Sequence, residues 1–348
     1  MKRMSAIVAG LLLAFVGTSA TIADTIHVPA DQPTIAAAIS ASVNGDVIAI
    51  AAGAYFEHSL NPSGKAITIQ GTLNEDGTLA STIDAQQGGS VFVINTVEGN
   101  GTVIKDLVIT GGSASASGGI SCFFSSPTIS DCTIEGNTAD YGGGIYCEYS
   151  SPTISDCTIK DNSAANLGGG IFSVNSDPTI SGCTIEGNEA SSGGGGISCN
   201  NSNPTISDCT IEGNTADYGG GIYCQDSSPV HSGCTFSGNT PDNVYGDSDW
   251  NPLRGEGGPS MITLENCTLC GTGEHIGGNI PILHLGDNHI SDCIDDGDLD
   301  GDGDVDTDDL NALHDALGIN NTDVNNNGCV DIDDLLYVIE DWNEGCTP

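Results

Sequence analysis

The feature that most constrains the fold of this chain is a block that repeats every 25 or 26 residues in its middle. Five prolines mark successive copies at intervals of 25, 26, 26 and 25 residues: Pro127, Pro152, Pro178, Pro204 and Pro229. A period of this length is typical of stacked solenoids. Each copy contains short β-branched runs, glycine clusters and asparagine without helical periodicity, so we expect coils of short strands separated by turns.

Stacked coils place the same position of every copy in one column. Three apolar columns are expected to fill the core: Ile129, Ile154, Ile180 and Ile206; Ile134, Ile159, Ile185, Ile211 and Phe236; and Ile120, Ile145, Ile171, Ile197 and Ile222. A fourth column consists of asparagines that can hydrogen-bond along the stack: Asn137, Asn162, Asn188, Asn214 and Asn239. The extra residue of the longer copies lies between this asparagine and the glycine run, where a loop should vary.

These motifs resemble the right-handed parallel β-helix, and the G-G-G-I and I/F-x-x-N motifs are similar to repeats of polymorphic outer-membrane proteins. The resemblance implies an all-β fold over residues 24–294, with a short capping helix near Pro33. Beyond Pro229 the copies are less regular. His231 replaces an isoleucine, an insertion is expected over residues 242–260, and Cys267 and Cys293 restore the cysteine register.

Nine cysteines fall in two inward-facing columns: Cys132, Cys157, Cys183, Cys209 and Cys234, then Cys122, Cys147, Cys199 and Cys224. Two interpretations stay open, because free cysteines pack well in cores and the partners within one coil are also ten residues apart, as a disulfide in each coil would require. Cys267, Cys270 and His275 have a zinc-like spacing, followed by His284 and His289. The core register of Cys267 and Cys293 argues against that metal site.

Residues 1–23 have the layout of a secretory signal peptide: Lys2 and Arg3, a short apolar run, and small residues up to Ala23. The run is too short to span a bilayer, and we expect an exported protein without a membrane span. The formal net charge is −41, from 47 acidic and 6 basic side chains. Nucleic acids and anionic membranes are therefore excluded as expected partners, since both are bound through lysine and arginine.

Secreted β-helices include polysaccharide lyases and glycosidases, which need unlike side chains brought together once. Lys105 and Lys160 are scattered, and the Asp131, Asp156 and Asp208 column suits a solvated ladder. Residues 127–147 and 204–224 are identical over 21 positions, as a structural repeat would be. No catalytic set is predicted. The irregular region supplies the weak candidates Asp247, Asp249, Trp250, Arg254 and His275.

The C-terminus contains two calcium-loop patterns, "DLDGDGDVDTDD" and "DVNNNGCVDIDD", which start 25 residues apart. Ligands at loop positions 1, 3, 5, 7, 9 and 12, with glycine at 6, are what such loops require. The predicted ligands of two Ca²⁺ ions are Asp298, Asp300, Asp302, Asp304 (backbone), Asp306 and Asp309, and Asp323, Asn325, Asn327, Cys329 (backbone), Asp331 and Asp334. An amphipathic helix is expected after each loop.

Two loop-helix units with aspartate at position 12 resemble a type I dockerin domain, here residues 295–348. The resemblance implies a cohesin-like protein partner, bound through Thr307, Asp308, Ile332 and Asp333, although these depart from the usual pair. We expect an exported or cell-surface β-helix protein that is polysaccharide-associated or adhesive and is tethered through this calcium module. The alternative is a polysaccharide lyase or glycoside hydrolase docked through its dockerin.

Overall fold

The computed structural model describes residues 23–247, 261–270, 276–278, 282–285 and 288–291. Residues 1–22 of the predicted signal peptide, the two calcium loops and the dockerin-like module of residues 295–348 therefore lie outside the described residues. Asp249, Trp250, Arg254 and His275 lie outside them as well.

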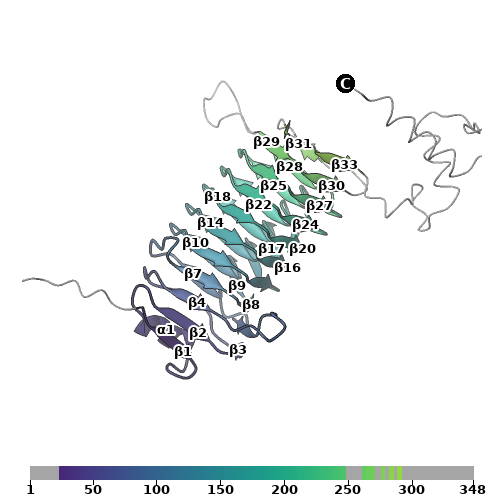
Figure 1. The fold of residues 1–348 in the computed structure, drawn as a ribbon. Helices are drawn as coiled ribbons and strands as arrows, with labels where there is room; N and C mark the ends of the chain where they lie inside the picture. Colours follow the sequence, from purple (N-terminus) through teal and green to yellow (C-terminus); the bar gives the residue numbers. More distant parts are fainter. Residues whose placement is uncertain (1–22, 248–260, 271–275, 279–281, 286–287, 292–348) are drawn as a thin grey trace, which may run out of the picture.

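The described residues form a parallel solenoid of about nine turns, in which each strand pairs with its equivalent one coil away (Figure 1). Sheet A contains β1 (Thr25–Val28), β2 (Val47–Ile50), β4 (Thr68–Gln70), β7 (Val103–Lys105), β11 (Thr128–Ser130), β15 (Thr153–Ser155), β19 (Thr179–Ser181), β23 (Thr205–Ser207), β26 (Val230–Ser232), β29 (Ile262–Glu265) and β32 (Ile282–Leu285). Sheet B contains β3 (Gly53–Tyr55), β5 (Ser81–Asp84), β8 (Val108–Thr110), β12 (Thr133–Glu135), β16 (Thr158–Lys160), β20 (Thr184–Glu186), β24 (Thr210–Glu212), β27 (Thr235–Ser237), β30 (Thr268–Cys270) and β33 (His289–Ser291).

Two further sheets close each coil. Sheet C contains β6 (Phe92–Ile94), β10 (Ile120–Phe123), β14 (Ile145–Glu148), β18 (Ile171–Val174), β22 (Ile197–Asn200), β25 (Ile222–Gln225), β28 (Val244–Asp247) and β31 (Ile276–Gly278). The short sheet D contains β9 (Ser113–Ala116), β13 (Thr138–Tyr141), β17 (Ser163–Leu167) and β21 (Glu189–Ala190). Strand β17 holds the extra residue of its coil as a bulge opposite β13, which confirms where the longer copies vary.

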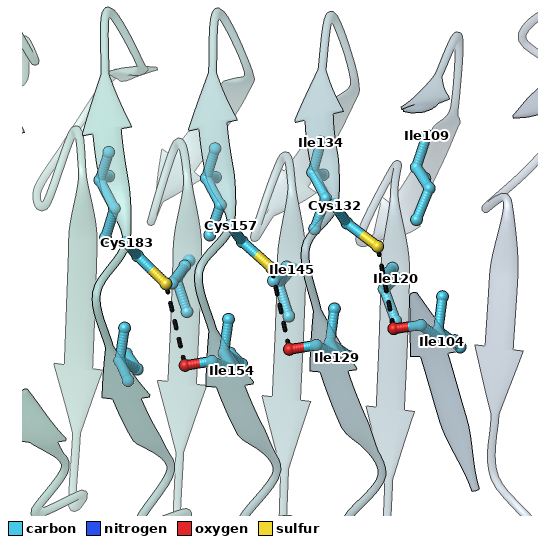
Figure 2. Packing of buried hydrophobic residues seen from close by; sticks show 14 of the residues in the cluster. Ile104, Ile109, Ile120, Ile129, Cys132, Ile134, Ile145, Ile154, Cys157 and Cys183 are labelled. Atoms are coloured by element: carbon cyan, nitrogen blue, oxygen red, sulfur yellow. Dashed lines mark hydrogen bonds between the residues drawn. The ribbon is translucent and has the colours of Figure 1, made fainter. Parts of the chain in front are cut away.

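The three predicted isoleucine columns form the core, one behind each of sheets A, B and C. Ile129, Ile134 and Ile145 are fully buried, and each pairs in register with the equivalent residue of the next coil. Figure 2 shows these columns facing one another across the interior. His231 takes the isoleucine position between Ile206 and Leu264, as the sequence predicts.

All ten cysteines whose side chains are described are buried free thiols, which favours the core interpretation over a disulfide in each coil. The Cys132 thiol lies 3.1 Å from the Ser130 carbonyl oxygen, and Cys157 and Cys183 repeat this contact in the next coils. Each of these thiols also lies 3.8 Å from an isoleucine carbonyl oxygen of the preceding coil (Figure 2). Cys267 continues the same column. A small apolar side chain with a weak donor suits this narrow interior.

Two polar ladders run the length of the repeated coils. In the asparagine ladder, the Asn162 side-chain oxygen accepts hydrogen bonds from the backbone N–H and side-chain amide of Asn137, at 3.1 and 3.0 Å. The same pattern continues to Asn239. A serine ladder was not predicted: the Ser150 hydroxyl oxygen accepts from the Ser125 backbone N–H at 3.0 Å, and this repeats to Ser227. Both ladders satisfy buried turn groups.

A short helix, α1 (Ile35–Ala41), caps the N-terminal coil, close to the predicted position near Pro33. The Glu57 carboxylate accepts hydrogen bonds from the first two helical N–H groups, of Ile35 and Ala36, at 2.8 and 2.9 Å. The Lys65 ammonium group donates to the carbonyl oxygens of Ile39 and Ser40 at the other end. Opposite charges at the two ends suit the helix dipole.

The region expected to be an insertion begins within a regular coil. Residues 242–260 were predicted as an interruption, but β28 (Val244–Asp247) pairs in register with β25 and continues sheet C. That part of the prediction was wrong because the segment contains one aromatic residue, Tyr245, and few other residues that indicate a strand. The described strands run from Thr25 to Ser291.

Candidate functional site

Of the weak catalytic candidates predicted in the irregular region, Asp247 is the one that the structure describes. It lies at the end of β28 on the outer side of sheet C. The Asp131, Asp156 and Asp208 column lies at the corner between sheets A and B. All three side chains are exposed, and their backbones have φ of 53°, 52° and 53°. Aspartate tolerates this left-handed conformation better than most residues, so the backbone conformation at the corner explains why aspartate recurs there.

All three lysines of residues 23–247 have their ammonium groups against oxygen atoms. Lys65 contacts helix carbonyls, Lys105 lies 3.3 Å from the Asp106 carboxylate, and Lys160 lies 3.6 Å from the Glu135 carboxylate. Lys160 faces Glu135 and Glu186 in sheet B, which supports the predicted exposed ladder of charges. Within the described ranges, no group of three or more His, Cys, Asp and Glu side chains is arranged to hold a metal ion.

The outer side of sheet C carries two aromatic clusters of the same construction. Aromatic cluster 1 consists of Tyr141, Tyr146 and Phe172, and aromatic cluster 2 consists of Tyr218, Tyr223 and Tyr245. In each cluster, a ring from the next coil contacts both tyrosines of one coil, at centroid distances of 5.2 to 5.8 Å. Tyr141 and Tyr218 are 39% and 52% exposed.

The neighbouring outer column of sheet C is mostly polar. Glu148, Asn200, Gln225 and Asp247 belong to it, and Val174 stands between Glu148 and Asn200. The Tyr146 hydroxyl donates to the Glu148 carboxylate at 2.9 Å, and the Asn200 amide donates to the Gln225 side-chain oxygen at 2.9 Å. Burial and this hydrogen bond raise the pKa of the Tyr146 hydroxyl, which therefore stays protonated as a donor.

One coil between the clusters carries no aromatic side chain at the equivalent positions. Gly193 and Ser198 stand where neighbouring coils have a tyrosine or leucine and an aromatic residue. A Cβ at Gly193 would lie 2.8 Å from the Tyr223 ring, so glycine is what lets this ring rest there. The hydroxyl group of Ser198, in the same coil as Gly193, is buried and has no hydrogen-bond partner.

A third group of rings lies at the corner after sheet C. Phe124 and Tyr149 stack with centroids 4.9 Å apart and an interplanar angle of 7°, and each is 51% exposed. Phe123 meets Phe124 edge to face. Both stacked residues have φ of 48°, at a column that continues with Asn175 and Asn201.

Neither aromatic cluster was predicted from the sequence. The signal was present: the segment A-D-Y-G-G-G-I-Y-C occurs twice, with tyrosines five residues apart on either side of a glycine run. What the segment alone could not reveal is that the third ring comes from the following coil, whose sequence differs.

The parallel pairing, the inward isoleucine columns and the asparagine ladder define a β-helix, and the sequence comparison agrees. The pattern of the family described as "Right handed beta helix region" matches residues 52–192, 93–269 and 169–308. These overlapping matches span more than half of the chain, which therefore belongs to the right-handed β-helix family. No curated protein matches the chain. No helix within the described ranges has the length and apolar character needed to cross a membrane.

Three solved structures illustrate the likeness. The pectate lyase Pel9A is 12% identical with a TM-score of 0.44, covering 73% of this chain and 73% of that one. The pectin methylesterase PemA from Erwinia chrysanthemi is 13% identical with a TM-score of 0.39, covering 64% and 80%. An alginate lyase from Paenibacillus sp. str. FPU-7 is 16% identical with a TM-score of 0.37, covering 77% and 99%.

Proposed function

We propose that this protein is an exported β-helix rod that associates with polysaccharide through the outer side of sheet C. The observation that carries the proposal is the pair of aromatic clusters on a rigid sheet. Exposed tyrosine rings offer apolar faces and a polar hydroxyl group, which suits ligands that have both apolar and hydrated polar surfaces. A few polar groups beside such rings can orient a bound ligand, as Glu148 and Gln225 would here.

The tether in this proposal is the calcium-binding, dockerin-like module of residues 295–348. The support for it is the double match of ligand positions in "DLDGDGDVDTDD" and "DVNNNGCVDIDD". Export through residues 1–23 would place the rod and its tether outside the cell, where calcium is available. A cohesin-like protein is the proposed partner of the module.

Incubation of the mature protein with polysaccharides tests the proposed function. We expect retention of the protein on a polysaccharide without release of reducing or unsaturated ends. Release of such ends would contradict the binding role and support the alternative, a polysaccharide lyase or glycoside hydrolase docked through its module.

Calorimetric titration of the full mature chain with calcium tests the tether. We expect two bound ions, because carboxylates gathered this closely need a cation between them. The double variant Asp298→Ala, Asp323→Ala should lose both ions while the β-sheet circular dichroism of the rod stays unchanged. A mature chain that binds no calcium would refute the assignment.

A further inference from the structure

The two aromatic clusters occupy equivalent positions in their coils, although the third ring is Phe172 in cluster 1 and Tyr245 in cluster 2, and the interplanar angles differ. Each cluster places one exposed tyrosine, directly before the glycine run, beside one half-buried tyrosine of the following strand, with a ring from the next coil against both. Strands β14 and β25, which carry Tyr146 and Tyr223, lie three coils apart along the rod (Figure 1). With strands about 4.8 Å apart, the clusters repeat after about 14 Å.

The charge on this face is of one sign. The eight strands of sheet C contain no lysine or arginine, and their acidic residues, Glu148 and Asp247, stand in the outer polar column. Of the lysines in residues 23–247, Lys65 contacts carbonyl oxygens of α1. Lys105 and Lys160 lie on the outer sides of sheets A and B, each against a carboxylate. A polyanionic ligand on sheet C would meet carboxylates within one Debye length, about 8 Å at physiological salt.

We infer that sheet C binds an uncharged polysaccharide chain, rather than a polyuronate, at two equivalent subsites formed by aromatic clusters 1 and 2. This inference rests on the proposed function and names the chemical class of its ligand. Neutral sugar rings present C–H faces to the tyrosines and hydroxyl groups to the neighbouring column. Carboxylates accept hydrogen bonds, and the amides of Asn200 and Gln225 both donate and accept, so this column can pair with hydroxyl groups without a cation.

The coil between the subsites keeps them separate. Gly193 and Ser198 interrupt the aromatic column, so a chain that lies along the rod axis contacts rings at two places, with one coil between them that carries no ring of its own. The Ser198 side chain of this coil is fully buried and offers the chain no hydroxyl group. Two linked contacts raise the overall affinity well above that of one, because the second contact forms at high effective concentration.

Binding of the full mature chain to immobilised glycans, with EDTA present throughout, tests the inference. The neutral probes are galactomannan, xyloglucan and mixed-linkage β-glucan, and the acidic probes are polygalacturonate and alginate. We expect measurable affinity for at least one neutral probe and none for the acidic probes. Raising the salt concentration should leave neutral binding nearly unchanged, since no charge is paired.

Three variants of the clusters and one control variant locate the binding. Tyr141→Ala and Tyr218→Ala each remove one exposed ring, and each should weaken binding at least tenfold, while the double variant should abolish it. Tyr149→Asn is the matched control: it removes a ring that is also half-exposed, and asparagine is the residue found at this corner in two other coils. Unchanged circular dichroism would verify that each variant folds.

The outcomes distinguish failure of the neutral-glycan inference from failure of the proposed polysaccharide-binding function. Binding to an acidic probe and to no neutral one overturns the neutral-glycan inference but leaves a polysaccharide-binding rod. Binding to no probe at all rejects the proposed function itself. Loss of neutral binding in Tyr149→Asn, with Tyr141→Ala and Tyr218→Ala unaffected, overturns the assignment to the two clusters.

Discussion

His231 is the residue least suited to its place, because an imidazole occupies a core position between Ile206 and Leu264. Its Nδ1 lies 3.2 Å from the Thr263 carbonyl oxygen, but its Nε2 is buried without a hydrogen-bond partner. Burial lowers the pKa of His231, and the nearby Cys234 and the Thr263 carbonyl oppose that shift. The uncharged imidazole is therefore the form that suits the folded protein.

This arrangement predicts acid sensitivity of the rod. As pH falls below about 6.5, the unfolded chain takes up a proton at His231 before the folded chain does. The stability contributed by the neutral imidazole is thus full above the unfolded pKa. It falls by at most about 1.4 kcal/mol per pH unit until the lower folded pKa is reached.

His231→Leu should remove this part of the pH dependence and raise the free energy of unfolding by about 1 kcal/mol at neutral pH, because no buried nitrogen is left unpaired. The measurement is urea unfolding of both proteins between pH 8 and pH 4, compared as a difference so that the carboxylates common to both cancel. Parallel pH profiles for the two proteins would contradict the assignment.

At the scale of the element, the asparagine ladder stabilises the turns that follow strands β12, β16, β20, β24 and β27 of sheet B. The Asn188 side chain accepts from the backbone and side-chain amides of Asn162, and donates to the Ile159 carbonyl oxygen and to Asn214. These groups are buried, so removal of one asparagine leaves partners in two coils unsatisfied.

Asn188→Ala should therefore lower the free energy of unfolding by about 3 kcal/mol or more, since several buried polar groups lose a partner at about 1 to 3 kcal/mol each. Asn203→Ala is the control. Its side chain accepts one hydrogen bond from the Ser228 backbone N–H at an exposed corner, and the expected cost is below about 1 kcal/mol. Urea midpoints and hydrogen exchange of the Asn162 amide would measure both. Equal effects of the two substitutions would show that burial of the ladder does not matter.

The elements also show how far the sequence alone predicts this fold and its candidate site. The isoleucine and asparagine columns were predictable because identical residues recur at one period. In stacked coils, residues one period apart must lie directly above one another. The serine ladder carried the same signal in Ser125, Ser150 and Ser176, but a serine before a proline also suits an ordinary turn. The third rings of the aromatic clusters, Phe172 and Tyr245, were beyond such reasoning because their contacts depend on how a turn in one coil approaches a strand in the next.

At the scale of the whole molecule, charge repulsion opposes the compact rod. The chain carries a formal net charge of −41, and the described lysines are already engaged with oxygen atoms. Like charges destabilise a compact state through self-repulsion, and salt screens that repulsion. The Debye length falls from about 30 Å at 0.01 M salt to about 10 Å at 0.1 M.

We therefore expect the thermal midpoint of the mature protein to rise by several degrees when sodium chloride increases from 0.01 to 0.1 M. EDTA should be present in both samples, so that occupancy of the calcium loops does not change. Sucrose added at equal osmolarity is the control for non-ionic effects. A thermal midpoint that falls with salt would mean that attractive ion pairs, such as Lys160 with Glu135, dominate instead.

The identical stretches at 127–147 and 204–224 make the rod adjustable in length at the level of its gene. Recombination between them would remove residues 127–203, which is three whole coils, and would join Ser126 to Pro204 at the same point of the turn. Sheets A, B and C would each rejoin in register, and Asn214 would take the ladder position of Asn137. Such a shortened chain is expected to fold as a rod with one aromatic cluster in place of two. Gene duplication in the opposite direction would lengthen the rod and multiply its clusters, so copy number alone could tune its reach and avidity.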